Sequence, residues 1–475
     1  MKKLLLCMVM LALMLMEGGC KNHFHFPILL DGPNTSDQAM DVNVVVGPDG
    51  TKHFFWVDCA TYDGNCDISY KRTYTGDRLL LIQNIYPELE ETPFVPYYRF
   101  PDAAMASDET IYLEWHYRDH DGQYFDCWNH KHVDGYFHGA SCNKLQDEGQ
   151  YSPENSYPKV IAYDNVAFAV YEVAGGTNTL YYRQLNPLDA SHGMVSPVAG
   201  VSSATPSLAV SSYLSGVETI YVLHVAWSSN GGNAESFTYF NDNYGTSGNM
   251  DNPHSSFTMG VRSDPVIVTT TGASKTVYVV YRDGLEGAPG YLKVMYCYLP
   301  DCPTAYAHDD GILVPSSNWW LVGAPDMGAK PDDSVLISFL GMNNTTRGTT
   351  SFQEVFYINY FAGNQNLIPT RVTVNNEKEG SPRLAMTLPG VTIAWRINSD
   401  PGYFRDVYII NNGTNEILKV FTSPVAVLGG YYDIAACGEY IGGIFIDRAT
   451  SLNPLHSPWV SFNDYGGYLP VTLKP

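Results

Sequence analysis

The sequence predicts an all-β fold, a β-propeller built from four-stranded antiparallel blades. Three observations lead to this prediction. Only 16% of the residues are charged while Tyr and Gly are abundant, which suits strands and polar turns better than surface helices. Short apolar runs rich in β-branched and aromatic residues alternate with Gly, Asn, Asp and Pro turns. The pattern repeats along nearly the whole chain with a period of about 56 residues.

The clearest strand of each repeat is apolar and ends in an aromatic residue, as in Val277-Tyr-Val-Val-Tyr281. Four strands per repeat, in units that each bury their sheet against the next one, are typical of a propeller. The spacing predicts eight blades, with seven blades and a decorated edge as the alternative. The aromatic residues that end this strand are Trp56, Trp115, Tyr171, Trp227, Tyr281, Phe339, Trp395 and Phe445.

A shorter apolar strand precedes the aromatic one and is commonly opened by proline, as in Pro206–Val210. Proline is tolerated at the first residue of a strand because no ladder donor is lost there. A third strand, such as Leu292–Tyr296, and a less regular fourth, such as residues 371–374, complete each unit. We expect one chain end to supply the outermost strand of the last blade, either residues 26–30 or residues 469–473.

The N-terminus predicts export. Lys2 and Lys3 precede an apolar run, Leu4–Met16, that is too short to span a bilayer as a mature helix. The following Glu17-Gly-Gly-Cys20 resembles a bacterial lipobox, although Glu17 stands where an apolar residue is usual. The resemblance implies a signal peptide over 1–19 and lipidation of Cys20. It also implies a lipoprotein of the cell envelope, at the outer membrane or cell surface, with simple secretion as the alternative. The repeats begin after a tether over 20–37, so we expect one propeller domain over 38–475.

The cysteines agree with an oxidising compartment. Six of them fall into pairs that are close in sequence, and each pair would staple one hairpin or loop. Zinc is the competing interpretation, but the sequence has no CxxC pair to support it. Cys437 is left over in an apolar context, which favours a buried and inert thiol. The expected disulfide cysteines are Cys59 with Cys66, Cys127 with Cys142, and Cys297 with Cys302.

The formal net charge is −22, from 49 acidic and 27 basic residues. Such a surface repels phosphate backbones, so we expect no nucleic-acid partner. The expected contact with a membrane is through the N-terminal lipid alone.

The repeats resemble the BNR, or sialidase-type, propeller repeat over about residues 38–475. Leu180-Tyr-Tyr-Arg183 is the closest copy of the family's third strand. The family's Asp box, Ser-x-Asp-x-Gly-x-x-Trp, survives only in part, in residues 241–246 and 461–468. The resemblance implies a propeller and, as one possible activity, glycoside hydrolysis of the sialidase kind.

Several arginines are candidates for a site of that kind. Sialidases grip a carboxylate with converging guanidinium groups, which can bind it in a bidentate manner. Arg99 lies in Tyr98-Arg-Phe-Pro101, which is similar to a sialidase motif. The alternative is that these arginines pair with neighbouring acids such as Asp119 and Asp283. A sialidase also needs a Tyr–Glu pair and an Asp, which the sequence does not single out. The further arginines, which follow second strands, are Arg118, Arg282, Arg396 and Arg448.

Histidine is concentrated in the second repeat, together with several aspartates. His and Asp side chains can hold a transition metal, but no recognised ligand spacing is present, and a polar hairpin stapled by Cys127 and Cys142 is the alternative. Asp-rich segments at 63–67 and 119–122 offer oxygens for calcium, yet their Asp-Gly sequences also suit β-turns. We therefore expect no cofactor, with calcium or a transition metal as the alternative. The histidines are His116, His120, His130, His132 and His138.

These observations predict a surface binding module that takes a glycan, peptide or protein ligand. Its site is expected on the face that carries the loops between second and third strands, because these loops differ in length on an otherwise regular scaffold. A sialidase-like glycoside hydrolase is one alternative. A structural component of an envelope assembly is another.

Overall fold

The computed structural model describes residues 28–29, 38–61, 64–73, 79–85, 97–118, 124–132, 135, 137, 141–144, 158–173, 179–186, 192–194, 201–231, 235–242, 251–255, 262–283, 291–299, 308–312, 319–343, 353–364, 367–374, 378–380, 382–386, 391–398, 406–411, 416–422, 428–437, 440–447 and 458–462. Every regular element among them is a β-strand, so the all-β prediction is confirmed for this part of the chain. No helix in it is long and apolar enough to cross a membrane.

The strands, in chain order, are β1 (Ile28–Leu29), β2 (Gln38–Val46), β3 (Lys52–Thr61), β4 (Gly64–Thr73), β5 (Leu79–Ile85), β6 (Tyr97–Met105), β7 (Thr110–Arg118), β8 (Tyr124–His132), β9 (Ser141–Lys144), β10 (Lys159–Tyr163), β11 (Val166–Val173), β12 (Thr179–Asn186), β13 (His192–Met194), β14 (Val201–Ser215), β15 (Glu218–Gly231), β16 (Glu235–Asp242), β17 (Asp251–Ser255), β18 (Arg262–Thr269), β19 (Thr276–Asp283), β20 (Tyr291–Tyr298), β21 (His308–Ile312), β22 (Trp319–Ala329), β23 (Val335–Asn343), β24 (Gln353–Tyr360), β25 (Thr370–Arg371), β26 (Lys378–Glu379), β27 (Arg383–Met386), β28 (Val391–Asn398), β29 (Asp406–Asn411), β30 (Glu416–Thr422), β31 (Leu428–Cys437), β32 (Tyr440–Asp447) and β33 (Pro458–Phe462).

Consecutive strands pair in antiparallel order within small sheets. Sheets β2–β5, β6–β9, β10–β13, β14–β17 and β18–β21 each hold four strands. Strands β22–β30 form one sheet whose two antiparallel parts, β22–β25 and β27–β30, are bridged by β26. The link to the first part is a single parallel pair, Gln353 with Lys378, and the link to the second is an antiparallel pairing of β26 with β28.

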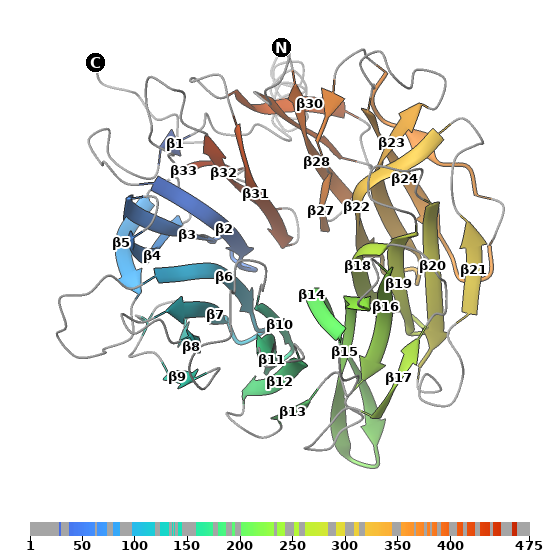
Figure 1. Ribbon diagram of the computed structural model, residues 1–475, viewed down its shortest axis with the longest axis horizontal. Helices are drawn as coiled ribbons and strands as arrows, with labels where there is room; N and C mark the ends of the chain where they lie inside the picture. The colour runs from blue at the N-terminus through green and yellow to red at the C-terminus, as the bar shows by residue number, and fades with distance from the viewer. Residues whose placement is uncertain are drawn as a thin grey trace, which may run out of the picture.

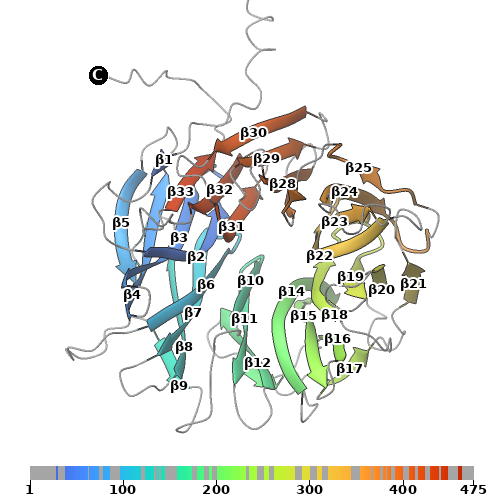
Figure 2. The ribbon, with the colours of Figure 1, turned by 45° about the horizontal axis from the view of Figure 1, so that its top comes forward.

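The sheets surround a common axis in chain order, as Figures 1 and 2 show. The first strand of each unit contacts the first strand of the next, from β2 through β6, β10, β14, β18, β22 and β27 to β31. Strand β31 in turn lies against β2, so the circle of first strands is closed. The protein is therefore a β-propeller.

The last sheet contains strands from both ends of the chain. Its order is β1-β33-β32-β31, and β1 pairs with β33 through Ile28 opposite Val460 and Leu29 opposite Trp459. Of the two segments expected to supply the outermost strand, the N-terminal one does so. Residues 469–473 lie outside the described residues.

The aromatic residues predicted to end the second strands form much of the core between sheets, but each second strand continues for two to five residues beyond its aromatic residue. Trp115 packs with residues of the preceding sheet such as Phe55 and Val57, and Trp227 packs in the same way toward β11 and β12. Full burial of a side chain of this size is a major contribution to stability. Among these aromatic residues, as far as the structure describes their side chains, Tyr171 is the exception, because it is only half-buried.

Proline is predicted to open several first strands, and this prediction is wrong for Pro206 and Pro265. Pro101, Pro206, Pro265 and Pro325 lie inside their first strands, where the pairing register with the second strand shifts. Proline has no N–H to give to the ladder, so an interior proline is accommodated at a bulge. A bulge turns the strand locally, and the residue that follows the proline is re-aimed by it.

The cysteine predictions have different outcomes. Cys127 and Cys142 form a disulfide between β8 and β9. Cys297 is disulfide-bonded, while its expected partner, Cys302, lies outside the described residues. Cys59 and Cys66 stand opposite each other in the register of β3 and β4, but their side chains are not described. Cys437 is a free, half-buried thiol whose pKa is raised by burial, which agrees with an inert role.

Candidate functional site

In every second first strand, a side-chain oxygen accepts a hydrogen bond from a backbone N–H group on the first strand of the next sheet. We call these contacts the axial hydrogen bonds. An edge strand has unpaired N–H groups, and here a side chain of the preceding sheet accepts them. The contacts run from Val44 N to Asp433 Oδ2 (3.1 Å), Val160 N to Asp102 Oδ2 (2.7 Å), Ile267 N to Ser207 Oγ (3.1 Å) and Leu384 N to Asp326 Oδ2 (2.7 Å).

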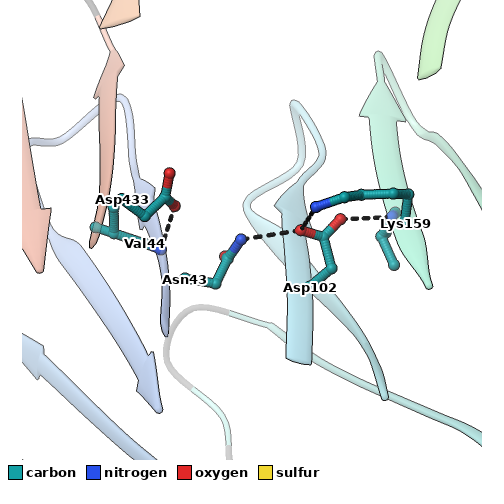
Figure 3. Close-up of polar contacts among 6 residues, drawn as sticks. Asn43, Val44, Asp102, Lys159 and Asp433 are labelled. Carbon is teal, nitrogen blue, oxygen red and sulfur yellow. Dashed lines mark hydrogen bonds and ion pairs between the residues drawn. The ribbon is translucent and has the colours of Figure 1, made fainter. Parts of the chain in front are cut away.

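Asp102 is the most highly connected of these acceptors. Its Oδ1 also accepts hydrogen bonds from Asn43 Nδ2 at 3.0 Å and from Lys159 Nζ at 3.1 Å. Figure 3 shows these side chains meeting from three first strands, with Asp433 on the other side of Asn43. Asp102 thus ties β6 to both of its neighbours, β2 and β10.

A buried polar cluster continues outward from Asp102 between sheets β6–β9 and β10–β13. Residues at i and i+2 of a strand share a face, and Glu114 lies opposite Asp102 in the register of β6 and β7. The cluster faces Ala167 and Ala169, whose small side chains contribute to the apolar part of the same interface. We define the buried polar cluster as Glu114, His116, Asp126, Trp128, Tyr171 and Arg183.

Arg183 is the centre of this cluster. Its Nη2 lies 2.8 Å from Asp126 Oδ2, and both side chains are almost completely buried. Its guanidinium carbon lies 3.9 Å from the ring centroid of Trp128 and 4.5 Å from that of Tyr171. A planar guanidinium suits such stacking. His116 Nε2 is 4.0 Å from the second oxygen of Asp126.

Burial dominates the electrostatics of the cluster. It raises the pKa of Glu114 well above the usual range, and the adjacent Asp126 raises it further. Burial also raises the pKa of Asp126, although Arg183 opposes this effect. Burial alone would lower the pKa of Arg183, but the two carboxyl groups outweigh it and the pKa is raised. The arginine is therefore charged, while the two acids are held toward their neutral forms.

Tyr171 and Tyr181 form a pair of stacked rings at the edge of the cluster. Their centroids are 6.2 Å apart with an interplanar angle of 21°, and both residues are half-buried. Tyr171 is near the end of β11 that leads into the loop between second and third strands. Burial raises the pKa of Tyr171, so its hydroxyl is neutral at physiological pH. The pair offers a partly exposed aromatic surface on a rigid, charged support.

The structure places the predicted arginines on three sheets. Arg99 is on β6, Arg118 on β7, Arg282 on β19 and Arg396 on β28. The side chain of Arg282 is buried, whereas those of Arg99, Arg118 and Arg396 are not described. Arg448 lies outside the described residues, so convergence of these arginines stays a prediction.

The predicted histidines separate along β7 and β8. His116 is buried beside Asp126, whereas His130 and His132 are exposed near the other end of the strand pair. His130 stacks on Tyr112 with centroids 6.0 Å apart. Within the described part of the chain, no three His, Cys, Asp or Glu side chains form a group able to hold a metal ion. His120 and His138 lie outside it.

The sequence prediction missed Glu114, Asp126 and Arg183 as a set. A signal exists for two of them. Glu114 stands directly before the closing aromatic, where other repeats carry Phe55, Val170 or Val280. Asp126 occupies a third-strand position where others carry Ile68, Leu180, Leu292, Val355 and Val407. Acids at positions that are apolar in most other repeats point to a specialised interface.

No protein-family model matches the sequence, and no curated protein matches it. Solved structures match it by fold. One is the β-propeller domain of the Trilobed protease from Pyrococcus furiosus, with 8% identity, coverage of 80% of this chain and 98% of that one, and a TM-score of 0.42. A second is the polysaccharide lyase Uly1, with 10% identity, coverage of 80% and 92%, and a TM-score of 0.46. A third is the α-L-arabinanase of Penicillium chrysogenum, with 11% identity, coverage of 76% and 92%, and a TM-score of 0.38. Likenesses of this size concern the fold and not the function.

Proposed function

We propose that the protein is an exported, lipid-anchored β-propeller that binds a glycan on the Tyr171–Tyr181 pair at the edge of the buried polar cluster. The stacked, half-buried pair of Tyr171 and Tyr181 is the observation that carries this proposal. Sugar rings pack on aromatic faces, and tyrosine offers both an apolar ring and a polar hydroxyl. A peptide or protein ligand is the alternative occupant of the same surface.

The rigid packing beneath Tyr171 favours binding of a ligand on its ring. Arg183 is fixed by Asp126 on one side and by the rings of Trp128 and Tyr171 on the others. A surface that is already ordered loses little conformational entropy when it binds a ligand. Tyr171 is thereby held ready for contact.

An eight-bladed ring is part of the proposal. The circle of first strands supports it, since β2, β6, β10, β14, β18, β22, β27 and β31 each begin one unit. The sheet of β22–β30 counts as two blades in this interpretation. Among the described residues, the strand pairing between its two antiparallel parts runs through the two-residue strand β26.

The binding surface can be tested by removing its rings one at a time. Tyr171→Ala or Tyr181→Ala is expected to weaken binding of the best ligand from a glycan array by about tenfold or more, as for aromatic hot spots. Tyr171→Phe keeps the stacking surface and is expected to bind nearly as well. Isothermal titration with the selected glycan measures both effects.

Tyr163 provides a matched control for the ring-removal variants. It is also half-buried and pairs with Tyr221, with centroids 6.3 Å apart, but it lies at the other end of the sheet. Tyr163→Ala is expected to leave affinity unchanged. Equal losses from Tyr163→Ala and Tyr171→Ala, or unaltered binding by both, would show that the tyrosine pair is not the binding surface.

A sialidase-like hydrolase is the second candidate, because the cluster gathers the residue types such an enzyme needs. Tyr171, Glu114 and Asp126 lie within electrostatic range of one another and of Arg183. Two features weigh against it. The two acids are fully buried, and the pKa of Tyr171 is raised, which is unfavourable for an ionised nucleophile. Turnover of a fluorogenic sialoside, lost in Glu114→Gln, would establish this candidate instead.

The proposed anchor and location rest on Glu17-Gly-Gly-Cys20. Expression in a Gram-negative host is expected to give a mature protein that begins at a lipidated Cys20 and fractionates with the envelope. Intact-mass spectrometry of the native chain and of Cys20→Ala distinguishes the outcomes. A mature N-terminus downstream of Cys20, with no added lipid mass, would replace the anchor by simple secretion.

A further inference from the structure

The turns between first and second strands share one face of the ring, which we call the turn face. Contacts between turns of neighbouring sheets establish it. Ser107 N, between β6 and β7, donates to Asp164 O, between β10 and β11. Ser274 N, between β18 and β19, donates to Asp333 Oδ2, between β22 and β23, at 2.7 Å. The loops between second and third strands lie on the opposite face.

The hairpin of β14 and β15 projects beyond the turn face. The neighbouring turns contact it at one cross-strand pair, Ser212 opposite Tyr221. Lys275 Nζ donates to Ser212 O at 3.0 Å, and the Tyr221 hydroxyl donates to Asp164 Oδ2 at 3.5 Å. Residues 213–220 continue past this pair, so they form a tip that stands out from the turns on both sides.

The length of β14 agrees with this projection. From its axial acceptor, Ser207, β14 continues for eight residues to Ser215, whereas β6 continues for three residues from Asp102 to Met105. A strand rises about 3.3 Å per residue, so the five additional residues carry the tip roughly 16 Å further along the strand direction.

The tip of the hairpin is apolar and open to solvent. Leu214 is 75% exposed and Val217 is 100% exposed. The tight turn is possible because Gly216 adopts a positive φ of 67°, and nothing lies within 4 Å of the place where its Cβ would be. Glu218 is the one charged residue of segment 213–220.

Exposed apolar side chains continue on the turn face of the next two sheets. Tyr298 ends β20 opposite Thr276, the first residue of β19, and Phe361 directly follows β24. Ile368 precedes β25, which runs antiparallel to β24, so it lies toward the same end of β24 as Phe361. A contiguous apolar surface of this kind marks an interaction site. We define the apolar sector as the exposed side chains of Leu214, Val217, Tyr298, Phe361 and Ile368.

Charge is distributed unevenly over the turn face. In the sheets of the apolar sector, Lys275 and Lys330 stand near Asp332 and Asp333, so acids and bases offset each other there. The turns of the first three sheets are acidic, and the apolar sector can meet a surface without them. Their acids are Asp49, Asp108, Glu109 and Asp164.

The chain enters β1 from the turn face. Through β33, Ile28 stands at the level of Ile444 on β32, and Leu29 stands one residue further from Tyr440, where β32 begins. Tyr440 belongs to the turn face, because a Cβ on Gly50, in the turn between β2 and β3, would lie 2.7 Å from its ring. The segment that leads from Cys20 to β1 therefore arrives on the same side as the hairpin tip.

The anchor and the hairpin lie at opposite edges of this face. Strand β31, in the sheet that contains β1, is four first strands away from β14 in either direction around the ring, as Figure 2 shows. Cys20 is eight residues before Ile28, a reach of at most about 28 Å. A lipid at one edge and an apolar tip at the other give two contacts to one surface.

We propose that the apolar sector docks on the bilayer that holds the lipid anchor, with the tip of the β14–β15 hairpin inserted at the headgroup level. The inference rests on the proposed lipidation of Cys20. The sequence predicts the lipid as the sole membrane contact, and the apolar sector adds a second. Docking points the loop face, and with it Tyr171, away from the membrane. Burial of Leu214 and Val217 favours the docked state by about tenfold or more for each side chain.

Hydrogen exchange of the mature chain on vesicles tests the docking. A hexahistidine tag in place of Cys20 holds the chain on phosphatidylcholine vesicles that contain a nickel-chelating lipid. This tether makes the result independent of natural lipidation, which intact-mass spectrometry tests separately. Protection of residues 213–220 is expected to rise about tenfold on the vesicles relative to the same chain in solution. Protection of residues 371–374, near the loop face, is expected to stay constant.

Two variants identify the contact. Leu214→Asp combined with Val217→Asp is expected to abolish the rise, and unchanged urea unfolding shows that the fold is kept. Val374→Asp is the matched control, because Val374 is 76% exposed and follows β25 toward the loop face. It is expected to keep the rise. Constant protection of the native tip on vesicles, or an equal rise in the double variant, would overturn the proposal. A rise that depends on protein concentration without vesicles would overturn it in favour of a second copy of the chain.

Discussion

Replacing Arg183 with alanine is expected to lower the free energy of unfolding by about 3–5 kcal/mol, the size seen when one partner of a buried ion pair is removed. Asp126, which lies 2.8 Å from Arg183 and is fully buried, would lose its counter-ion. Glu114 would lose the same compensating charge. Urea denaturation at pH 7 measures the loss. The loss is expected to shrink at lower pH, because protonated acids no longer need the arginine.

Two further variants test whether burial of the Arg183–Asp126 ion pair explains the loss of stability expected for Arg183→Ala. Arg183→Ala combined with Asp126→Asn is expected to recover part of the lost stability, since the unpaired carboxylate is gone. Lys159→Ala removes a partly exposed cation that pairs with Asp102, which keeps its hydrogen bonds from Asn43 and Val160, and is expected to cost at most about 1 kcal/mol. A loss for Arg183→Ala as small as that for Lys159→Ala would contradict the buried-pair explanation.

Removing the disulfide with Cys127→Ser and Cys142→Ser is expected to cost about 3 kcal/mol. The two cysteines are 15 residues apart, and a cross-link of that span restricts the unfolded chain by about this amount. Cys127 is also fully buried against Trp115, so an unpartnered hydroxyl in its place adds to the cost. Thermal and urea unfolding of the variant and the oxidised parent give the difference.

Cys437→Ser is the matched control for the disulfide variant. Its thiol is free and half-buried, so the expected change is under about 1 kcal/mol. Reduction of the parent protein also opens the disulfide of Cys297, so it is expected to cost at least as much as the double variant. A reduced parent that unfolds at the same urea concentration as the oxidised one would show that the disulfide does not stabilise the fold.

The sequence predicts the scaffold because the scaffold repeats. Each second strand is read from a local apolar run and its closing aromatic, and the side chains of Trp56, Trp115, Trp227 and Trp395 are indeed buried. The axial hydrogen bonds are not visible in the same way. They depend on bulges that re-aim Asp102 and Asp326, and a proline in the sequence does not reveal whether it opens a strand or interrupts one.

The buried polar cluster was missed for a related reason. Glu114, Asp126 and Arg183 come from three strands of two sheets, and only the pairing register brings them together. A single charged residue inside an apolar repeat is visible in the sequence, but its partner is not. The sequence prediction placed the site in the loops between second and third strands. The groups whose pKa is raised, Glu114, Asp126 and Arg183, lie instead on strands β7, β8 and β12.

The pairing of β1 with β33 also constrains the order in which the protein can be made. Residues 28–29 leave the ribosome early, but their partners at 459–460 follow after nearly the whole chain. Strand β1 therefore remains without its partner β33 until synthesis of the chain is nearly complete. Contacts between residues so far apart in sequence form slowly, and an unpaired strand edge is prone to aggregation meanwhile. Maturation of this protein is expected to be limited by the meeting of its two ends.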